Sequence, residues 1–300
     1  MVAGVDWGMS AQLQSFFGGR LILPAVLASV LVASCGHDGD AARAADVPVV
    51  AVSVLPLAGV VDRLLPSGAA ELRILVPPGA SPHSFEPGVE QLTVIQRADL
   101  VLEVGHPALA WESNWLDGLL AGTAAERIRV SEGCAWLDDD PHVWLDPGCL
   151  RTISERATGG LVGLYPERAT EIRDRLDVFR QAIAEEDISI RQSLSGRRGM
   201  AFLAQHGAWD YFGRAYELEQ IAILSHGSGD GGAARLASVI DRARAAGIHT
   251  VFVQPQFSMD AARMVAREIG AGIRPLDPLR RDPLEALRET AEAVLEATAP

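Results

Sequence analysis

The sequence predicts an α/β protein in which two parallel-sheet α/β lobes are joined by one long, rigid helix. Short apolar, β-branched runs alternate with helical segments over residues 49–165, and the same alternation returns over residues 196–300. Alternation of this kind is typical of a parallel sheet with helices on both faces. Between the two halves, residues 166–195 carry an uninterrupted helical pattern.

The first half contains apolar runs bounded by proline or glycine, with amphipathic segments between them. Asp146 directly before Pro147 indicates that a further helix begins there, because aspartate is a favoured N-cap and proline fits the first helical turn. We expect strands at 49–55, 71–76, 99–104 and 127–130, and helices at 57–65, 89–97 and 108–120.

The second half repeats the pattern, and Gly270 has the position of a helix C-cap. We expect strands at 200–204, 218–224, 250–253 and 272–276, and helices at 233–246, 259–269 and 283–298.

The linking segment begins at Pro166 and contains no glycine and no second proline before Leu194. About 29 helical residues with a rise of 1.5 Å each would span roughly 43 Å. An apolar stripe on one face predicts that this helix packs along both lobes and limits hinge motion between them. The stripe consists of Ile172, Leu176, Phe179, Ile183, Ile190 and Leu194.

The N-terminus has the features of an export signal. Arg20 precedes a short apolar run that ends in small residues directly before Cys35. This pattern predicts a signal peptide over residues 1–34, with Cys35 as the lipidated first residue of the mature chain. An ordinary signal peptide followed by a chance cysteine is the alternative. Residues 35–48 are mostly small and polar, as expected for a tether.

The composition is that of a globular protein, with 48% hydrophobic and 22% charged residues. The net charge of −13 argues against nucleic acid as a partner. Two cysteines remain after Cys35, namely Cys134 and Cys149. In an oxidising compartment they could form a disulfide worth roughly 3 kcal/mol, or they could be two unrelated buried thiols.

Three histidines in three short, separate segments are the candidate functional residues. His83 and His142 each follow a proline, and His206 follows the expected strand at 200–204. Asp277, which is followed by Pro278, is a fourth candidate. Two of these residues precede the long helix and two follow it, so all four could meet in the cleft between the lobes. Three imidazoles and one carboxylate are a ligand set that zinc prefers.

The segments around these residues resemble the metal-specific solute-binding proteins of ABC importers. The resemblance runs from about Val49 to the C-terminus. It rests on the segments Val76–Pro87, Asp140–Pro147, Val251–Ser258 and Leu276–Leu279. It implies two α/β lobes joined by a helix and a metal site made of His83, His142, His206 and Asp277.

The resemblance also implies a function outside the cytoplasm. The protein would capture zinc in the periplasm or at the outer face of the cytoplasmic membrane and deliver it to a membrane permease. We expect a monomer that touches the membrane only through a lipid anchor at Cys35, and a metallochaperone is left open as a further partner. Histidine rather than glutamate at position 206 favours zinc, while manganese or iron remains the alternative within the family.

Two departures from the family pattern concern loops. Residues 126–139 contain no histidine, whereas many zinc receptors of this type carry a histidine-rich loop there. Only the acidic residues Asp138, Asp139 and Asp140 remain beside His142. The glycine-rich segment 225–232 replaces a more ordered stretch, and its His226 is interpreted as a solvated loop residue.

Residues near the candidate ligands have weaker assignments. Glu86, Asp146 and Asp210 could accept a proton from a ligand histidine, or could be helix caps or surface charges. His106, His37 and His249 are interpreted as structural or surface residues, and Trp111, Trp115, Trp144 and Trp209 as packing residues.

Functions of other classes remain open at this stage. A zinc-dependent hydrolase could use the same ligands if a water occupied a free position, but the chain has no His-Glu-x-x-His motif. A receptor for haem or a siderophore would need a wide apolar or basic cleft. An adhesin-like role could exist in addition.

Overall fold

The structure is a computed structural model, and it describes residues 47–137, 139–224 and 232–298. The expected signal peptide, the lipidated Cys35 and all but the last two residues of the tether lie outside the described residues. Asp138 and residues 225–231, which include His226, lie outside them as well. Within the described ranges, no helix is long and apolar enough to cross a membrane.

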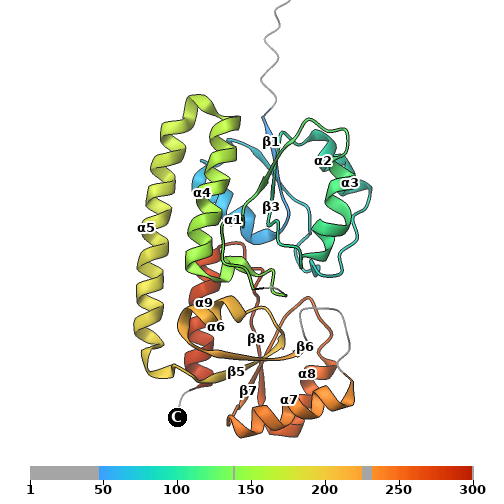
Figure 1. Ribbon diagram of the computed structural model, residues 1–300, viewed down its shortest axis with the longest axis vertical. Helices are drawn as coiled ribbons and strands as arrows, with labels where there is room; N and C mark the ends of the chain where they lie inside the picture. Colours follow the sequence, from blue (N-terminus) through green and yellow to red (C-terminus); the bar gives the residue numbers. More distant parts are fainter. Residues whose placement is uncertain (1–46, 138, 225–231, 299–300) are drawn as a thin grey trace, which may run out of the picture. The chain divides into compact units, whose positions relative to one another are not determined.

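The first lobe is built on a parallel sheet with the strand order β2-β1-β3-β4 (Figure 1). Its strands are β1 (Val49–Val52), β2 (Glu71–Ile74), β3 (Leu100–Glu103) and β4 (Glu126–Arg129). The connecting helices are α1 (Leu55–Leu64), α2 (Val89–Arg97) and α3 (Asp117–Leu120). The two central strands, β1 and β3, are buried along their whole length, and all of their residues except Glu103 are apolar.

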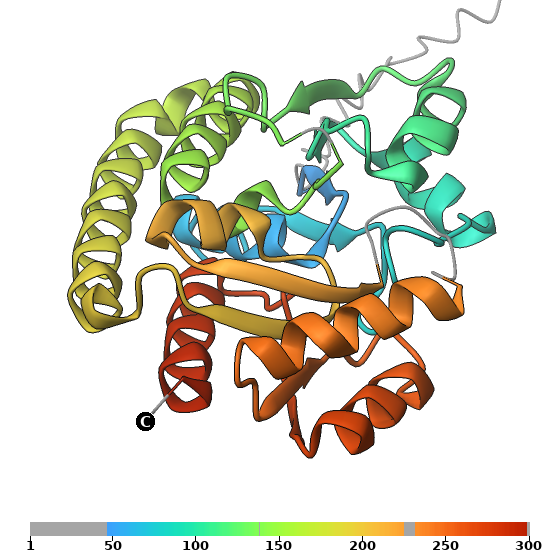
Figure 2. The same ribbon diagram turned by 60° about the horizontal axis from the view of Figure 1, so that its bottom comes forward.

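The second lobe repeats this arrangement with the strand order β6-β5-β7-β8, also parallel throughout. Its strands are β5 (Ala201–His206), β6 (Glu219–Leu224), β7 (Thr250–Val253) and β8 (Gly272–Pro275). Its helices are α6 (Asp210–Tyr216), α7 (Ala233–Ala245) and α8 (Asp260–Ile269). Figure 2 shows α7 and α8 side by side, where they cover the small core that contains Leu203 of β5.

Two long helices connect the lobes. Asp146 caps α4 (Pro147–Leu164), as expected, and accepts hydrogen bonds from the backbone of Gly148 and Cys149 at 2.7 and 3.1 Å. The linking helix α5 (Ala169–Ser193) packs along α4 between short 3-10 turns at Pro166–Arg168 and Ser195–Arg197 (Figure 1). All six residues of its predicted apolar stripe are buried. The predicted fold class is confirmed.

The C-terminal helix α9 (Pro283–Ala297) belongs to the second half of the sequence but contacts α1 and α5. Ion pairs accompany these contacts, among them Arg281 with Asp62 of α1 at 2.7 Å and Arg288 with Glu186 of α5. One hydrophobic core runs without interruption from β1 to α9. This shared core is a physical reason to expect small relative motion of the lobes.

Three local expectations differ from the structure. Pro56 does not follow a strand but occupies the first turn of α1, which the fixed backbone of proline permits. The expected helix at 108–120 is a π-helix over Glu112–Leu116 followed by α3. No helix was expected at α6, because its seven residues are too few to show a clear helical period.

Candidate metal centre

Three histidine rings meet between the two lobes. The Nε2 atom of His83 lies 3.3 Å from Nε2 of His142 and 3.1 Å from Nε2 of His206. Candidate ligand atoms of the three residues all lie within 4.8 Å of one another. In a tetrahedral zinc site with Zn–N bonds of 2.0–2.1 Å, two nitrogen ligands are about 3.3 Å apart. The two separations from His83 match this value, and the three histidines together could hold a single metal ion.

Each histidine is placed by a rigid feature of the backbone. His83 lies after β2 in a proline-rich turn, where Ser84 N–H donates to the carbonyl of Ser81 at 3.1 Å. His142 directly precedes a short 3-10 helix, η2 (Val143–Leu145). His206 is the last residue of β5, at the carboxyl edge of the second sheet. Such edges are where parallel α/β sheets usually present their functional side chains.

The carboxylate of Asp140 orients His142. Its Oδ1 lies 2.6 Å from Nδ1 of His142 and also accepts the His142 backbone N–H at 2.8 Å. Both side chains are almost completely buried. A proton on Nδ1, shared with this carboxylate, leaves Nε2 as a lone-pair donor that faces the other two histidines.

Asp140 has no specific role in the sequence-based prediction, although it contacts a candidate ligand. The sequence Asp140-Pro141-His142 could have indicated this contact. A carboxylate two residues before a histidine, with a proline between them, can fold back onto the imidazole ring. The three carboxylates that the sequence placed near the histidines make the following contacts or are exposed. Asp146 caps α4 and pairs with Arg214 at 3.0 Å, Asp210 accepts from Gln220 at 2.6 Å, and Glu86 is exposed.

Asp277, the fourth predicted ligand, lies outside the cluster of three histidines. It follows β8, and its Oδ1 accepts hydrogen bonds from Nε2 of Gln256 at 3.0 Å and from the backbone of Leu279 at 2.9 Å. It lines a small cavity of about 50 Å³ together with Pro77 and Pro82. Its carboxylate therefore borders the loop that carries His83.

Aromatic side chains surround the histidines. The ring of Phe257 lies 4.8 Å from that of His206, and the ring of Trp144 lies 5.2 Å from that of His142. Trp144 is buried and donates from Nε1 to the carbonyl of Pro278 at 2.8 Å, which links the lobes. Trp144 and Trp209 are both buried packing residues, as expected.

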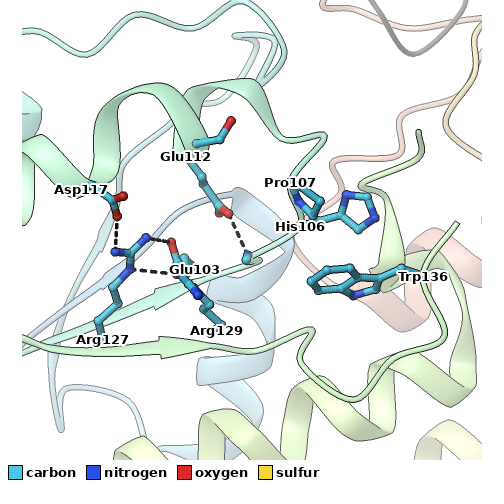
Figure 3. Close-up of a pocket in the computed structure, with 10 residues that line it drawn as sticks. Glu103, His106, Pro107, Glu112, Asp117, Arg127, Arg129 and Trp136 are labelled. Carbon is cyan, nitrogen blue, oxygen red and sulfur yellow. Dashed lines mark hydrogen bonds and ion pairs between the residues drawn. The ribbon is translucent and has the colours of Figure 1, made fainter. Parts of the chain in front are cut away.

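His106 lies outside the metal cluster, in a pocket of the first lobe of about 330 Å³ (Figure 3). Its Nδ1 accepts the N–H of Ala108 at 3.1 Å, so its Nε2 carries the proton and donates to the carbonyl of Leu137 at 3.1 Å. Trp136 packs on the ring at 4.9 Å between centroids. These contacts support the structural interpretation of His106.

The same pocket contains a buried acid, Glu112, which accepts the backbone N–H groups of Val104 and Gly105 at 2.8 Å each. Burial raises the pKa of Glu112 from 4.5 to about 7. Next to it, Glu103 is paired with Arg127 at 2.8 Å and with Arg129 at 3.0 Å (Figure 3). The carboxylate of Glu112 is thus hydrogen-bonded to backbone N–H groups, and that of Glu103 is paired with two arginines.

Curated relatives of this chain are named as zinc-binding or zinc-uptake proteins. The chain is 22% identical over 263 residues to the high-affinity zinc uptake system protein ZnuA of Haemophilus ducreyi, covering 77% of this chain and 84% of that protein. It is 24% identical over 237 residues to the zinc-binding protein AdcA of Streptococcus pyogenes, covering 70% of this chain. The chain spans about half the length of AdcA, of which 46% is covered.

Solved structures share the fold. A crystal structure of ZnuA matches with a TM-score of 0.78 and 28% identity, covering 85% of this chain and all of that one. The periplasmic zinc-binding protein TroA of Treponema pallidum matches with a TM-score of 0.76 at 18% identity, covering 84% of this chain and 99% of that one. The family model described as zinc-uptake complex component A, periplasmic (ZnuA), matches residues 50–297. With the fold and the histidine cluster in agreement, the chain belongs to this family.

Proposed function

We propose that this protein is a receptor that captures zinc outside the cytoplasmic membrane and delivers it to an ABC importer. The observation that carries the proposal is the convergence of three Nε2 atoms at 3.1 and 3.3 Å. Membership of the zinc-uptake component A family supports it. A deletion mutant of ZnuA that is 27% identical to this chain was solved with zinc bound.

The proposed ligands are His83, His142, His206 and Asp277. The short distances from Nε2 of His83 to Nε2 of His142 and His206 support the role of the three histidines. Asp277 would complete a tetrahedral set by turning its carboxylate toward the ion, and its position beside the His83 loop supports this role. Three imidazoles favour zinc over manganese, which prefers sites richer in oxygen. A complete four-ligand set also leaves no free position for a water nucleophile, which favours a receptor over an enzyme.

We also propose how the protein is exported, how it is anchored and which partners receive or supply the zinc. Residues 1–34 would direct export, and lipidation of Cys35 would tether the protein at the outer face of the membrane. A pneumococcal relative, 24% identical over 229 residues, is a zinc-binding lipoprotein, which supports this localisation. The receptor would act as a monomer that docks on a permease, and a metallochaperone is a further candidate partner.

Zinc titration of the wild-type protein and of two matched variants tests the site. His206→Ala removes a ligand, and we expect a loss of zinc affinity of more than about a hundredfold, beyond the usual effect of losing an outer-shell partner. The exposed His249 provides the control, and His249→Ala should leave the affinity unchanged. Equal zinc affinity of His206→Ala and the wild type would sink the proposal.

A second pair of variants tests Asp277 as the proposed fourth ligand. Asp277→Asn should weaken zinc binding by about tenfold or more, while Asp241→Asn, at an exposed position on α7, should have no effect. If Asp277→Asn binds zinc like the wild type, a three-histidine site is the correct description. The metal content of protein isolated from its native compartment identifies the cargo, because zinc outcompetes manganese in vitro at most such sites.

A further inference from the structure

Two thiols meet at the base of the loop that carries His142. Cys134 lies in the segment after β4, and Cys149 lies in the first turn of α4. The thiol of Cys134 donates to the backbone carbonyl of Cys149, with 3.9 Å between the sulfur and the oxygen. Cys134 is half-buried and Cys149 is buried. After Cys35, these are the only cysteines of the chain.

We propose that Cys134 and Cys149 form a disulfide in the exported protein, and that this bridge holds the loop over residues 134–149 in its metal-binding conformation. The inference rests on the proposed function, because it needs both export and a metal at His142. The loop carries Asp140 and His142, so the bridge would close a ring around the ligand and the carboxylate that orients it.

The chemistry requires a disulfide-carrying oxidoreductase of the oxidising compartment as the oxidant. The thiolate of Cys134 attacks the disulfide of the oxidant and forms a mixed disulfide. The sulfur of Cys149 then displaces the oxidant from Cys134, so the oxidant leaves with both electrons and the two thiol protons are released or transferred. The hydrogen bond with Cys134, together with burial, raises the pKa of Cys149, so the half-exposed Cys134 is the thiol that reacts first.

Besides the contact of Leu137 with His106, three hydrogen bonds hold this loop to the second lobe. The hydroxyl of Tyr211 accepts the N–H of Leu137 at 2.8 Å, and Arg214 donates to the carbonyl of Ala135 at 2.9 Å and to Asp146 at 3.0 Å. These hydrogen bonds depend on the position of the second lobe, so even a small relative movement would weaken them. A bridge within the first lobe would hold Asp140 and His142 in place independently of such movement, and such preorganisation increases affinity.

The oxidation state can be read from one peptide. The full chain is exported with its own leader, isolated without reductant, alkylated and digested with trypsin. Residues 130–151 form a single tryptic peptide that holds both cysteines, because no lysine or arginine occurs between Arg129 and Arg151. We expect no alkyl group on this peptide before reduction and two after it. Alkylation of both thiols without prior reduction overturns the inference.

The effect on the metal site is measured on the same protein in both redox states. After removal of the reductant, reduced protein should bind zinc about tenfold more weakly than oxidised protein. It should also unfold at a temperature lower by about 5–10 °C, as expected for loss of a bridge that closes a loop of this length. The double variant Cys134→Ser/Cys149→Ser should match the reduced protein and be insensitive to reductant. Equal zinc affinity of oxidised and reduced protein overturns the proposed role of the bridge.

These outcomes separate the inference from the proposed function. If oxidised protein fails to bind zinc tightly, the zinc-receptor proposal is wrong, and the role of the bridge in zinc binding falls with it. If both redox states bind zinc tightly and equally, the receptor proposal stands and only the role of the bridge is wrong.

Discussion

His142 and His106 are two buried histidines of the same lobe with opposite surroundings. Each is about 2–3% exposed. His106 uses both ring nitrogens on backbone groups, Ala108 and Leu137. His142 has a carboxylate on Nδ1 and two further imidazoles in front of Nε2. Burial alone therefore does not distinguish a metal ligand from a structural histidine, whereas the partners of the two ring nitrogens do.

The largest effect is expected when each of these two imidazole rings is removed by substitution with alanine. His142→Ala should weaken zinc binding by about a thousandfold, about 4 kcal/mol, because it would delete a proposed direct ligand. His106→Ala should leave zinc affinity within about threefold of the wild type. It should lower the free energy of unfolding by about 1–3 kcal/mol, because two backbone groups lose their partners.

Isothermal calorimetry and urea unfolding on both variants measure these effects. Similar losses of zinc affinity in the two variants would remove the distinction drawn between the two histidines.

The second test concerns Glu112, which lies in the pocket of His106. Because its pKa is raised from 4.5 to about 7, the folded state holds a proton that the unfolded state releases. The contribution of Glu112 to the free energy of unfolding is therefore fully present below pH 4.5, and it is lost as the pH rises through about 7. The change in the free energy of unfolding is on the order of 3 kcal/mol.

In Glu112→Gln this contribution to the pH dependence should vanish, while zinc affinity stays unchanged. Urea unfolding of the variant and the wild type at several pH values measures the difference. Parallel stability profiles for the two proteins would contradict the pKa assignment.

A third test leaves the imidazole of His142 intact and changes the carboxylate that hydrogen-bonds to its Nδ1. Asp140→Asn keeps the shape of the side chain but removes its charge, so the hydrogen bond to Nδ1 becomes weaker and Nε2 a poorer donor. We expect zinc affinity to fall by about tenfold, about 1.4 kcal/mol. The matched control is Asp139→Asn at the exposed neighbouring position, which should bind zinc like the wild type.

The smallest expected effect is that of Tyr211→Phe, which deletes the hydroxyl that accepts from Leu137. Leu137 also accepts from His106, so this one residue links the second lobe to the structural histidine. The free energy of unfolding should fall by about 1 kcal/mol, with little change in zinc affinity. A tenfold loss of affinity would instead show that the 134–149 loop depends on α6 more than on its own anchors.

Much of the fold could be predicted from local sequence signals. The ends of α2, β6 and β7 lie within one residue of expectation, since each is bounded by a clear change of polarity or by glycine or proline. Less could be predicted where periodicity was weak, as in the π-helix Glu112–Leu116 and in α6. The convergence of His83, His142 and His206 could be anticipated only as a possibility, because their separations in sequence say nothing about distance.

Local sequence patterns were enough to predict the order of the strands, the buried stripe of α5 and the candidate histidines, because apolar periodicity and proline act over a few residues. Three-dimensional packing was needed to show which ring nitrogens meet, that Asp140 is the carboxylate behind His142, and that the thiol of Cys134 lies against the backbone of Cys149. It also decided that α9 packs on α1 of the other lobe. These features depend on how two sheets and a shared core pack together, and packing is a property of the whole chain rather than of any segment.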